Sequence, residues 1–272
     1  MLNRIFTRRQ LIDVLQGEVN NVITAASKKY SIDLNRKTKE DLFKELYFIL
    51  DSCYKNEYYY KNKVLNEILL KKNSKNTVLL SEVQMKEAIA DLVSINRKAV
   101  VYEIKTEFDD FSRLERQVND YYRTFAQVSV VVHESALSKA SSYIDQLMLP
   151  IGIWVLRNNG KLVMKRKPLD YYEKLSYESM FRVLRKYEFE RVIVLNKKLL
   201  PQCSDFYYYE RCLNLIKSIP IMDLYRCFLL ILRNRKIHSI VDYENVDYGL
   251  RFLTYDLSLN PSQLELLKES VF

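Results

Sequence analysis

The most informative segment of this 272-residue chain reads Ala90-Asp91-Leu92-Val93-Ser94-Ile95, then a polar turn, then Ala99-Val100-Val101-Tyr102-Glu103-Ile104-Lys105. Its two short apolar segments predict two β-strands joined as a hairpin. Residues i and i+2 of a strand point to the same face, so Glu103 and Lys105 project together. If the strands pair, Asp91 comes close to both. One edge of a sheet would then carry two carboxylates and an ammonium, which suits a hard divalent cation with a positive charge beside it.

The same residues also fit a simpler interpretation, because acids and lysines are common at solvated strand ends. Their context favours a functional role. Asp91 precedes an apolar, β-branched segment, where a charge is unexpected. Glu103 follows four residues suited to burial, and a helical segment with its own polar face comes directly after Lys105.

Glycine is scarce, and this excludes several classes of enzyme. A P-loop or a dinucleotide-binding fingerprint needs several glycines within a few residues, so that backbone amides reach phosphates. A nucleophile elbow needs two glycines around a serine. The chain has four glycines, all far apart: Gly17, Gly152, Gly160 and Gly249. We therefore exclude most kinases, NTPases, NAD enzymes and α/β-hydrolases.

Cysteine, histidine and hydropathy narrow the class further. None of the four cysteines lies two or three residues from another, and there are two histidines, so no zinc pair, redox CxxC or three-histidine site is predicted. The hydrophobic fraction of 48% is typical of a folded globule. No segment approaches the roughly 18–20 apolar residues of a membrane span, and the basic start lacks the apolar core of a signal peptide. We expect a cytoplasmic protein without membrane contacts.

The net charge of +9 favours an anionic partner, most commonly nucleic acid. Residues 1–80 carry most of the excess, with 15 Lys and Arg against 9 Asp and Glu. Lys71, Lys72 and Lys75 in this segment are therefore candidate nucleic-acid contacts. A solvated helical surface would have a similar composition.

The order of expected elements predicts an α/β fold. A helical N-terminal region (1–63) precedes an α/β core (64–168), and a helical C-terminal region (169–272) follows. Within the core we expect strands at 77–83, 90–95, 99–105 and 127–133, a helix capped by Asp109 or Asp110 and running to about 125, a second helix at 136–148, and a hairpin over 151–165. The order β-β-β-α-β-α-β-β predicts a mixed sheet flanked by helices.

These residues resemble the motif of the PD-(D/E)XK nuclease superfamily. The resemblance covers about residues 64–156. More narrowly, the segments around Tyr102 and Arg113 resemble bacterial sce7726-type proteins and, more distantly, RecB-like nucleases with a QxxxY element. Ala90 stands where the superfamily often has proline. The matching residues are Glu82, Asp91, Glu103-Ile104-Lys105, Arg113-Leu114-Glu115-Arg116-Gln117 and Gln117-Val118-Asn119-Asp120-Tyr121.

The resemblance implies a restriction-endonuclease-like fold and a Mg²⁺-dependent deoxyribonuclease, with Mn²⁺ as a substitute metal. It implies that Asp91, Glu103 and the Ile104 carbonyl hold the metal, with Glu82 as an extra acidic ligand. Glu67 is the alternative to Glu82, and Glu87 is expected to be a surface residue. The implied catalytic residues are Asp91, Glu103 and Lys105, supported by Gln117 and Tyr121, with Arg113 and Arg116 as DNA phosphate contacts.

Two other classes remain open. One is a nucleic-acid-binding module that keeps this fold without cleaving its ligand. The other is an interaction protein that binds a non-nucleic-acid partner through its helical regions. Association into a homo-oligomer is also left open.

Overall fold

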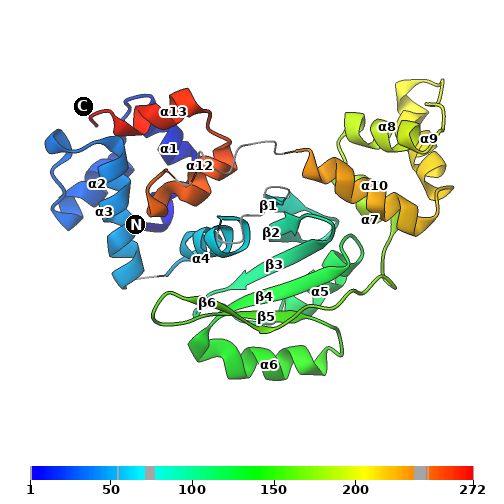
Figure 1. The fold of residues 1–272 in the computed structure, drawn as a ribbon, viewed down its shortest axis with the longest axis horizontal. Coiled ribbons are helices and arrows are strands. Elements are labelled where there is room, and N and C mark those ends of the chain that lie inside the picture. The colour runs from blue at the N-terminus through cyan, green and yellow to red at the C-terminus, as the bar shows by residue number, and fades with distance from the viewer. Residues whose placement is uncertain (1, 54, 71–76, 236–242, 244, 272) are drawn as a thin grey trace. The chain divides into compact units, whose positions relative to one another are not determined.

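The computed structural model describes residues 2–53, 55–70, 77–235, 243 and 245–271 (Figure 1). The chain divides into two compact units. Unit 1 comprises Met1–Lys75 together with His238–Phe272, and unit 2 comprises Asn76–Ile237. Lys71, Lys72 and Lys75 lie outside the described residues, so their proposed contacts with phosphate stay a prediction.

Unit 2 is built on one six-stranded sheet in the order β1-β2-β3-β4-β5-β6. The pairs β1–β2, β2–β3 and β5–β6 are antiparallel, whereas β3–β4 and β4–β5 are parallel. The mixed sheet predicted from the element order is therefore confirmed. The strands are β1 (Val78–Gln84), β2 (Ile89–Ile95), β3 (Ala99–Lys105), β4 (Gln127–His133), β5 (Gly152–Leu156) and β6 (Leu162–Arg166).

The central strands match their predicted bounds because their sequences favour burial on both faces. β4 is buried at all seven positions, as expected for a parallel strand inside a sheet. The antiparallel edge strand β6 alternates less regularly and exposes Met164 and Lys165.

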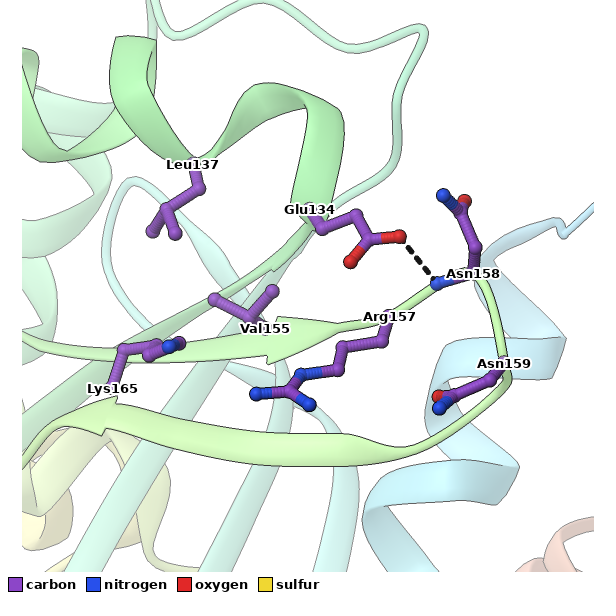
Figure 2. A pocket seen from close by; sticks show the side chains of 7 residues that line it. All are labelled: Glu134, Leu137, Val155, Arg157, Asn158, Asn159 and Lys165. Atoms are coloured by element: carbon purple, nitrogen blue, oxygen red, sulfur yellow. Dashed lines mark hydrogen bonds between the residues drawn. The ribbon is translucent and has the colours of Figure 1, made fainter.

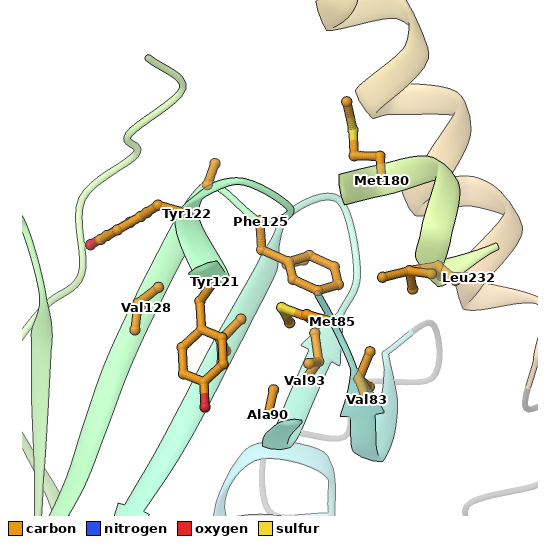
Figure 3. Packing of buried hydrophobic residues seen from close by; sticks show 14 of the residues in the cluster. Val83, Met85, Ala90, Val93, Tyr121, Tyr122, Phe125, Val128, Met180 and Leu232 are labelled. Atoms are coloured by element: carbon orange, nitrogen blue, oxygen red, sulfur yellow. The ribbon is translucent and has the colours of Figure 1, made fainter. Parts of the chain in front are cut away.

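Six α-helices of unit 2 accompany the sheet. Residues of α5, α6, α7 and α10 share one apolar cluster with the strands. Figure 3 shows Tyr121 and Phe125 beside Val93 of β2, with Met180 of α7 and Leu232 of α10 in the same cluster. The helices are α5 (Leu114–Tyr122), α6 (Leu137–Gln146, after the 3₁₀ turn Glu134–Ala136), α7 (Tyr177–Val183), α8 (Lys186–Leu195), α9 (Asp205–Lys217) and α10 (Ile221–Arg233).

The helix after β3 begins later than predicted. We expected Asp109 or Asp110 to cap it, but α5 starts at Leu114. The Asp109 carboxylate instead accepts hydrogen bonds from the backbone and side chain of Thr106. The Asp110 carboxylate accepts one from the backbone N–H of Ser112 at 2.8 Å. Both acids therefore close tight turns before the helix, and this prediction was wrong.

Unit 1 is helical and combines the two ends of the chain. The Asn62 amide donates to the Tyr248 carbonyl at 2.8 Å, and Thr38 forms an isolated β-bridge with Ser270. Its α-helices are α1 (Arg8–Leu15), α2 (Asn21–Tyr30), α3 (Lys39–Cys53), α4 (Glu57–Leu65), α12 (Arg251–Leu257) and α13 (Pro261–Glu265). Shorter turns are η1 (Leu2–Arg4), η2 (Leu34–Arg36), the π-helical η3 (Asn66–Leu70), η5 (Tyr248–Leu250) and η6 (Leu266–Lys268).

The unit boundaries differ from the three successive regions expected from the sequence. α7 to α10 belong to the unit that holds the sheet, while the last helices join the first ones. No helix in the described part of the chain is long and apolar enough to cross a membrane.

Candidate active site

Strands β2 and β3 bring Asp91 and Glu103 to facing positions. Leu92 pairs with Tyr102 in the antiparallel register, so the next residues along each strand are Asp91 and Glu103. The backbone N–H of Ile104 donates to Oδ2 of Asp91 at 2.6 Å. The half-buried Asp91 is thereby fixed against the end of β3.

Glu103 is the centre of a buried polar cluster, which we call the Glu103 cluster: Glu103, Lys105, Gln117 and Tyr121. Only 3% of Glu103 is exposed. Its Oε1 lies 2.6 Å from the Gln117 amide nitrogen and 2.9 Å from Nζ of Lys105. Its Oε2 accepts a hydrogen bond from the Tyr121 hydroxyl at 2.5 Å. Four residues predicted from the sequence pattern therefore meet at one carboxylate.

Lys105 and Gln117 also contact each other, which closes the cluster. Nζ of Lys105 donates to Oε1 of Gln117 at 3.0 Å. The amide of Gln117 therefore donates to the carboxylate and accepts from the ammonium. This fixes its orientation, because the reverse orientation would place like groups together.

The Tyr121 hydroxyl acts as a proton donor in this setting. Burial first, and the negative charge of Glu103 second, raise the pKa of Tyr121 far above its ordinary value. The hydroxyl stays protonated at neutral pH and can donate to Glu103. It also lies 3.0 Å from the Ile89 carbonyl oxygen at the start of β2.

The carboxylates of Asp91 and Glu103 are the type of ligand that Mg²⁺ prefers. Magnesium is commonly held by one or two carboxylates, and water or substrate phosphate supplies its other ligands. Among the described residues, no group of three or more His, Cys, Asp and Glu side chains is arranged to hold a metal ion. The donor set therefore fits a two-carboxylate site. Both oxygens of Glu103 already accept hydrogen bonds from protein donors.

Glu82 occupies an unusual backbone position in β1. It has φ of 51°, a region that non-glycine residues seldom adopt. Val78 and Leu80 belong to the apolar cluster before it, and Val83 and Met85 belong to it afterwards. The face that points to the core therefore changes here, and the expectation that Glu82 shares the face of Val78 and Leu80 was wrong.

Glu82 nevertheless lies level with Asp91, because Ser81 pairs with Leu92 and Val83 pairs with Ala90. Its role as a ligand stays a prediction. Glu67 belongs to η3 in unit 1. Glu87 is exposed in the turn before β2, as expected.

The two arginines expected to contact phosphate lie on the exposed side of α5. Arg113 immediately precedes the helix, and Arg116 lines a hollow of about 600 Å³ together with Arg123 and Lys174. No hydrogen bond or ion pair within the described ranges joins Arg113 or Arg116 to Glu103. The structure therefore does not bring them into the Glu103 cluster.

Asp120 is a buried residue of this region that the sequence analysis missed. Its Oδ2 accepts hydrogen bonds from the backbone N–H groups of Glu87 at 2.7 Å and Ala88 at 3.0 Å. It therefore ties α5 to the turn between β1 and β2. Its spacing of three residues after Gln117, on one side of the helix, is the signal that could have identified it.

Comparison with known proteins places the chain in a family. The sequence model for bacteriophage P4 protein cII matches residues 51–245, a range that includes the whole sheet, α5 and the Glu103 cluster. No curated protein and no solved structure matches the chain. The match does not bear on the resemblance to PD-(D/E)XK nucleases. Because it covers more than half of the 272 residues, the chain belongs to the bacteriophage P4 cII protein family.

Proposed function

We propose that this protein is a metal-dependent nuclease that hydrolyses phosphodiester bonds in DNA. The observation that carries the proposal is the convergence of Lys105, Gln117 and Tyr121 on the buried carboxylate of Glu103. Asp91 faces this carboxylate from the neighbouring strand. The proposal includes the PD-(D/E)XK type of site and Mg²⁺ as its metal.

The energetics of burial support a functional role for the cluster. A carboxylate and an ammonium lose several kcal/mol of hydration each when they are buried, and apolar residues of similar volume are often at least as stabilising. A sheet that needed only stability would have no use for Glu103 and Lys105 at the end of β3. Their retention together with two uncharged partners is typical of a site in which charge does chemical work.

Lys105 has donor capacity left for a substrate. An ammonium carries three N–H donors. Lys105 gives one to Glu103 and one to Gln117, and no third partner occurs within the described part of the chain. The remaining donor can stabilise negative charge on a phosphate oxygen as the bond to the leaving group breaks.

A bound divalent cation would supply an activated water and neutralise phosphate charge, with Asp91 and Glu103 as its carboxylate ligands. Gln117 and Tyr121 would then hold Glu103 in one orientation. Their contacts to Glu103 already fix both carboxylate oxygens in this structure.

One observation favours a second candidate, a nucleic-acid-binding module without cleavage. Glu103 is fully satisfied inside the protein, because Oε1 and Oε2 both accept hydrogen bonds and Lys105 balances the charge. In such a module the Glu103 cluster would brace the end of β3 without exchanging partners.

Incubation with linear and circular DNA in Mg²⁺, Mn²⁺ or EDTA separates the two candidates. A nuclease cuts with either metal and is silent in EDTA. We expect Asp91→Ala and Glu103→Ala to abolish cleavage, and Lys105→Ala to lose activity while keeping metal binding by calorimetry. Glu210→Ala, an exposed acid of α9, is the matched control and should cut normally. Full activity of Asp91→Ala would refute the assigned site.

A further inference from the structure

A second hollow, of about 600 Å³, lies where β4 and β5 end (Figure 2). Leu137 of α6 and Val155 of β5 provide its apolar lining. Arg157 enters it from the turn between β5 and β6, and Lys165 enters it from β6. We call this hollow the hairpin pocket.

The two cations of the hairpin pocket have no acidic partner. No hydrogen bond or ion pair of the Arg157 or Lys165 side chain occurs among the residues that the structure describes. In Figure 2 these side chains extend from opposite strands toward the same space. Two unpaired cations that face one cavity favour an anion as its occupant.

Glu134 also lines the hairpin pocket, but its carboxylate has a separate task. Oε1 of Glu134 accepts a hydrogen bond from the backbone N–H of Asn158 at 2.7 Å. The carboxylate therefore holds the β5–β6 turn against the end of β4. This fixes the position of Arg157, the residue before Asn158.

The hairpin pocket lies on the same edge of the sheet as Lys105. In the parallel register Lys105 is level with Val132, and His133 is level with Leu156, so β3, β4 and β5 all end here. Adjacent strands lie about 4.8 Å apart, which places β5 roughly 10 Å from β3. The carboxyl ends of parallel strands are the usual place for ligands in open α/β sheets.

We propose that Arg157 and Lys165 bind a phosphate group of the nucleic-acid strand, next to the phosphodiester that meets Lys105. This inference rests on the proposed function for its substrate. A guanidinium offers paired N–H donors to phosphate oxygens, and an ammonium adds a point charge. Leu137 and Val155 suit the apolar side of a sugar. The hairpin pocket thus fixes the position of the strand along the edge of the sheet and carries no base specificity.

The test measures DNA affinity without cleavage. Fluorescence anisotropy of a labelled DNA duplex is recorded in EDTA over a range of salt concentrations for the wild type, Arg157→Gln, Lys165→Gln and the double variant. Each phosphate contact that is lost lowers the slope of log K against log salt by about 0.9 on duplex DNA. We expect the double variant to lose about one such unit. Lys161→Gln, in the same turn but outside the hairpin pocket, is the charge-matched control.

The outcomes separate this inference from the proposed function. A wild type that binds DNA but never cuts it, combined with a lower slope in the double variant, retains the phosphate site and rejects the nuclease. An unchanged slope in the double variant overturns the phosphate site whether or not the wild type cuts. A loss of equal size in Lys161→Gln overturns it too, because the effect would then be general electrostatics. A wild type that does not bind DNA overturns it as well. The thermal midpoint of each variant should match the wild type, since Arg157 and Lys165 are exposed.

Discussion

Replacing Gln117 with alanine tests whether the Glu103 cluster is one cooperative unit. The substitution removes the amide that donates to Oε1 of Glu103 and accepts from Lys105. The direct ion pair between Glu103 and Lys105, at 2.9 Å, remains. The buried carboxylate keeps the Tyr121 hydroxyl as its other partner.

The size of the effect follows from the two lost contacts. A hydrogen bond to a charged group contributes about 1.5–3 kcal/mol to stability. Water that enters the vacated space recovers part of this loss. We therefore expect Gln117→Ala to lower the free energy of unfolding by about 2–4 kcal/mol. If the protein cuts DNA, turnover should fall by roughly one to three orders of magnitude, the range seen when a charge-stabilising group is removed.

Urea unfolding at pH 7 measures the stability change, and an unchanged m-value shows that the unfolded state is comparable. Glu115→Ala, an exposed residue of the same helix, is the control and should change stability by less than about 0.5 kcal/mol. A double-mutant cycle with Glu103→Gln should give a coupling energy between about 0.5 and 3 kcal/mol. Zero coupling would refute the argument that Gln117 acts through Glu103. Recovery of cleavage by excess Mg²⁺ would make Gln117 part of the metal site instead.

Three further changes can be checked directly. Tyr121→Phe keeps the buried ring and removes only the contact to one charged group, so it should harm stability and turnover less than Gln117→Ala; equal or greater damage in the same two assays would reverse the assigned roles. Burial would raise the pKa of Glu188, but hydrogen bonds from Arg235 and from the Arg185 backbone lower it below the ordinary value of 4.5, so its ionised form stabilises the fold above that pH and the benefit is lost as pH falls through the lowered pKa. Glu188→Gln should therefore cost about 3 kcal/mol at pH 7 and progressively less in acid, and a gap that is constant from pH 7 to pH 3 would contradict this. Gly152→Ala would place Cβ 2.5 Å from Oγ of Ser129 and 2.8 Å from the Pro168 backbone nitrogen, so we expect a loss of about 1–3 kcal/mol, and a normal melting temperature would show that the Pro168 segment shifts easily.

The strands were predictable because their signal is local. Ala99–Lys105 and Gln127–His133 combine β-branched residues with boundaries marked by polar turns, and these bounds agree with the structure. The same periodicity placed Gln117 and Tyr121 one helical turn apart, on the side of α5 that reaches Glu103.

The remaining features depend on contacts between distant residues. Asp120 holds backbone groups more than thirty positions earlier in the chain, and no local pattern identifies such a partner. Asp109 and Asp110 looked like helix caps, but neighbouring Thr106 and Ser112 competed for their carboxylates. The positive φ of Glu82 is invisible in composition, because glutamate has no special preference for it.

The division into units has a consequence for biosynthesis. Unit 1 needs both ends of the chain, since the Tyr58 hydroxyl and the Asn62 side chain bond to backbone groups of residues 248–252. Unit 2 is encoded between them and leaves the ribosome first as a complete set of strands and helices. At roughly 5–20 residues per second, the N-terminal helices wait on the order of ten to thirty seconds for their partners. During translation these helices are therefore the segment in greatest need of a chaperone, even though they are synthesised first.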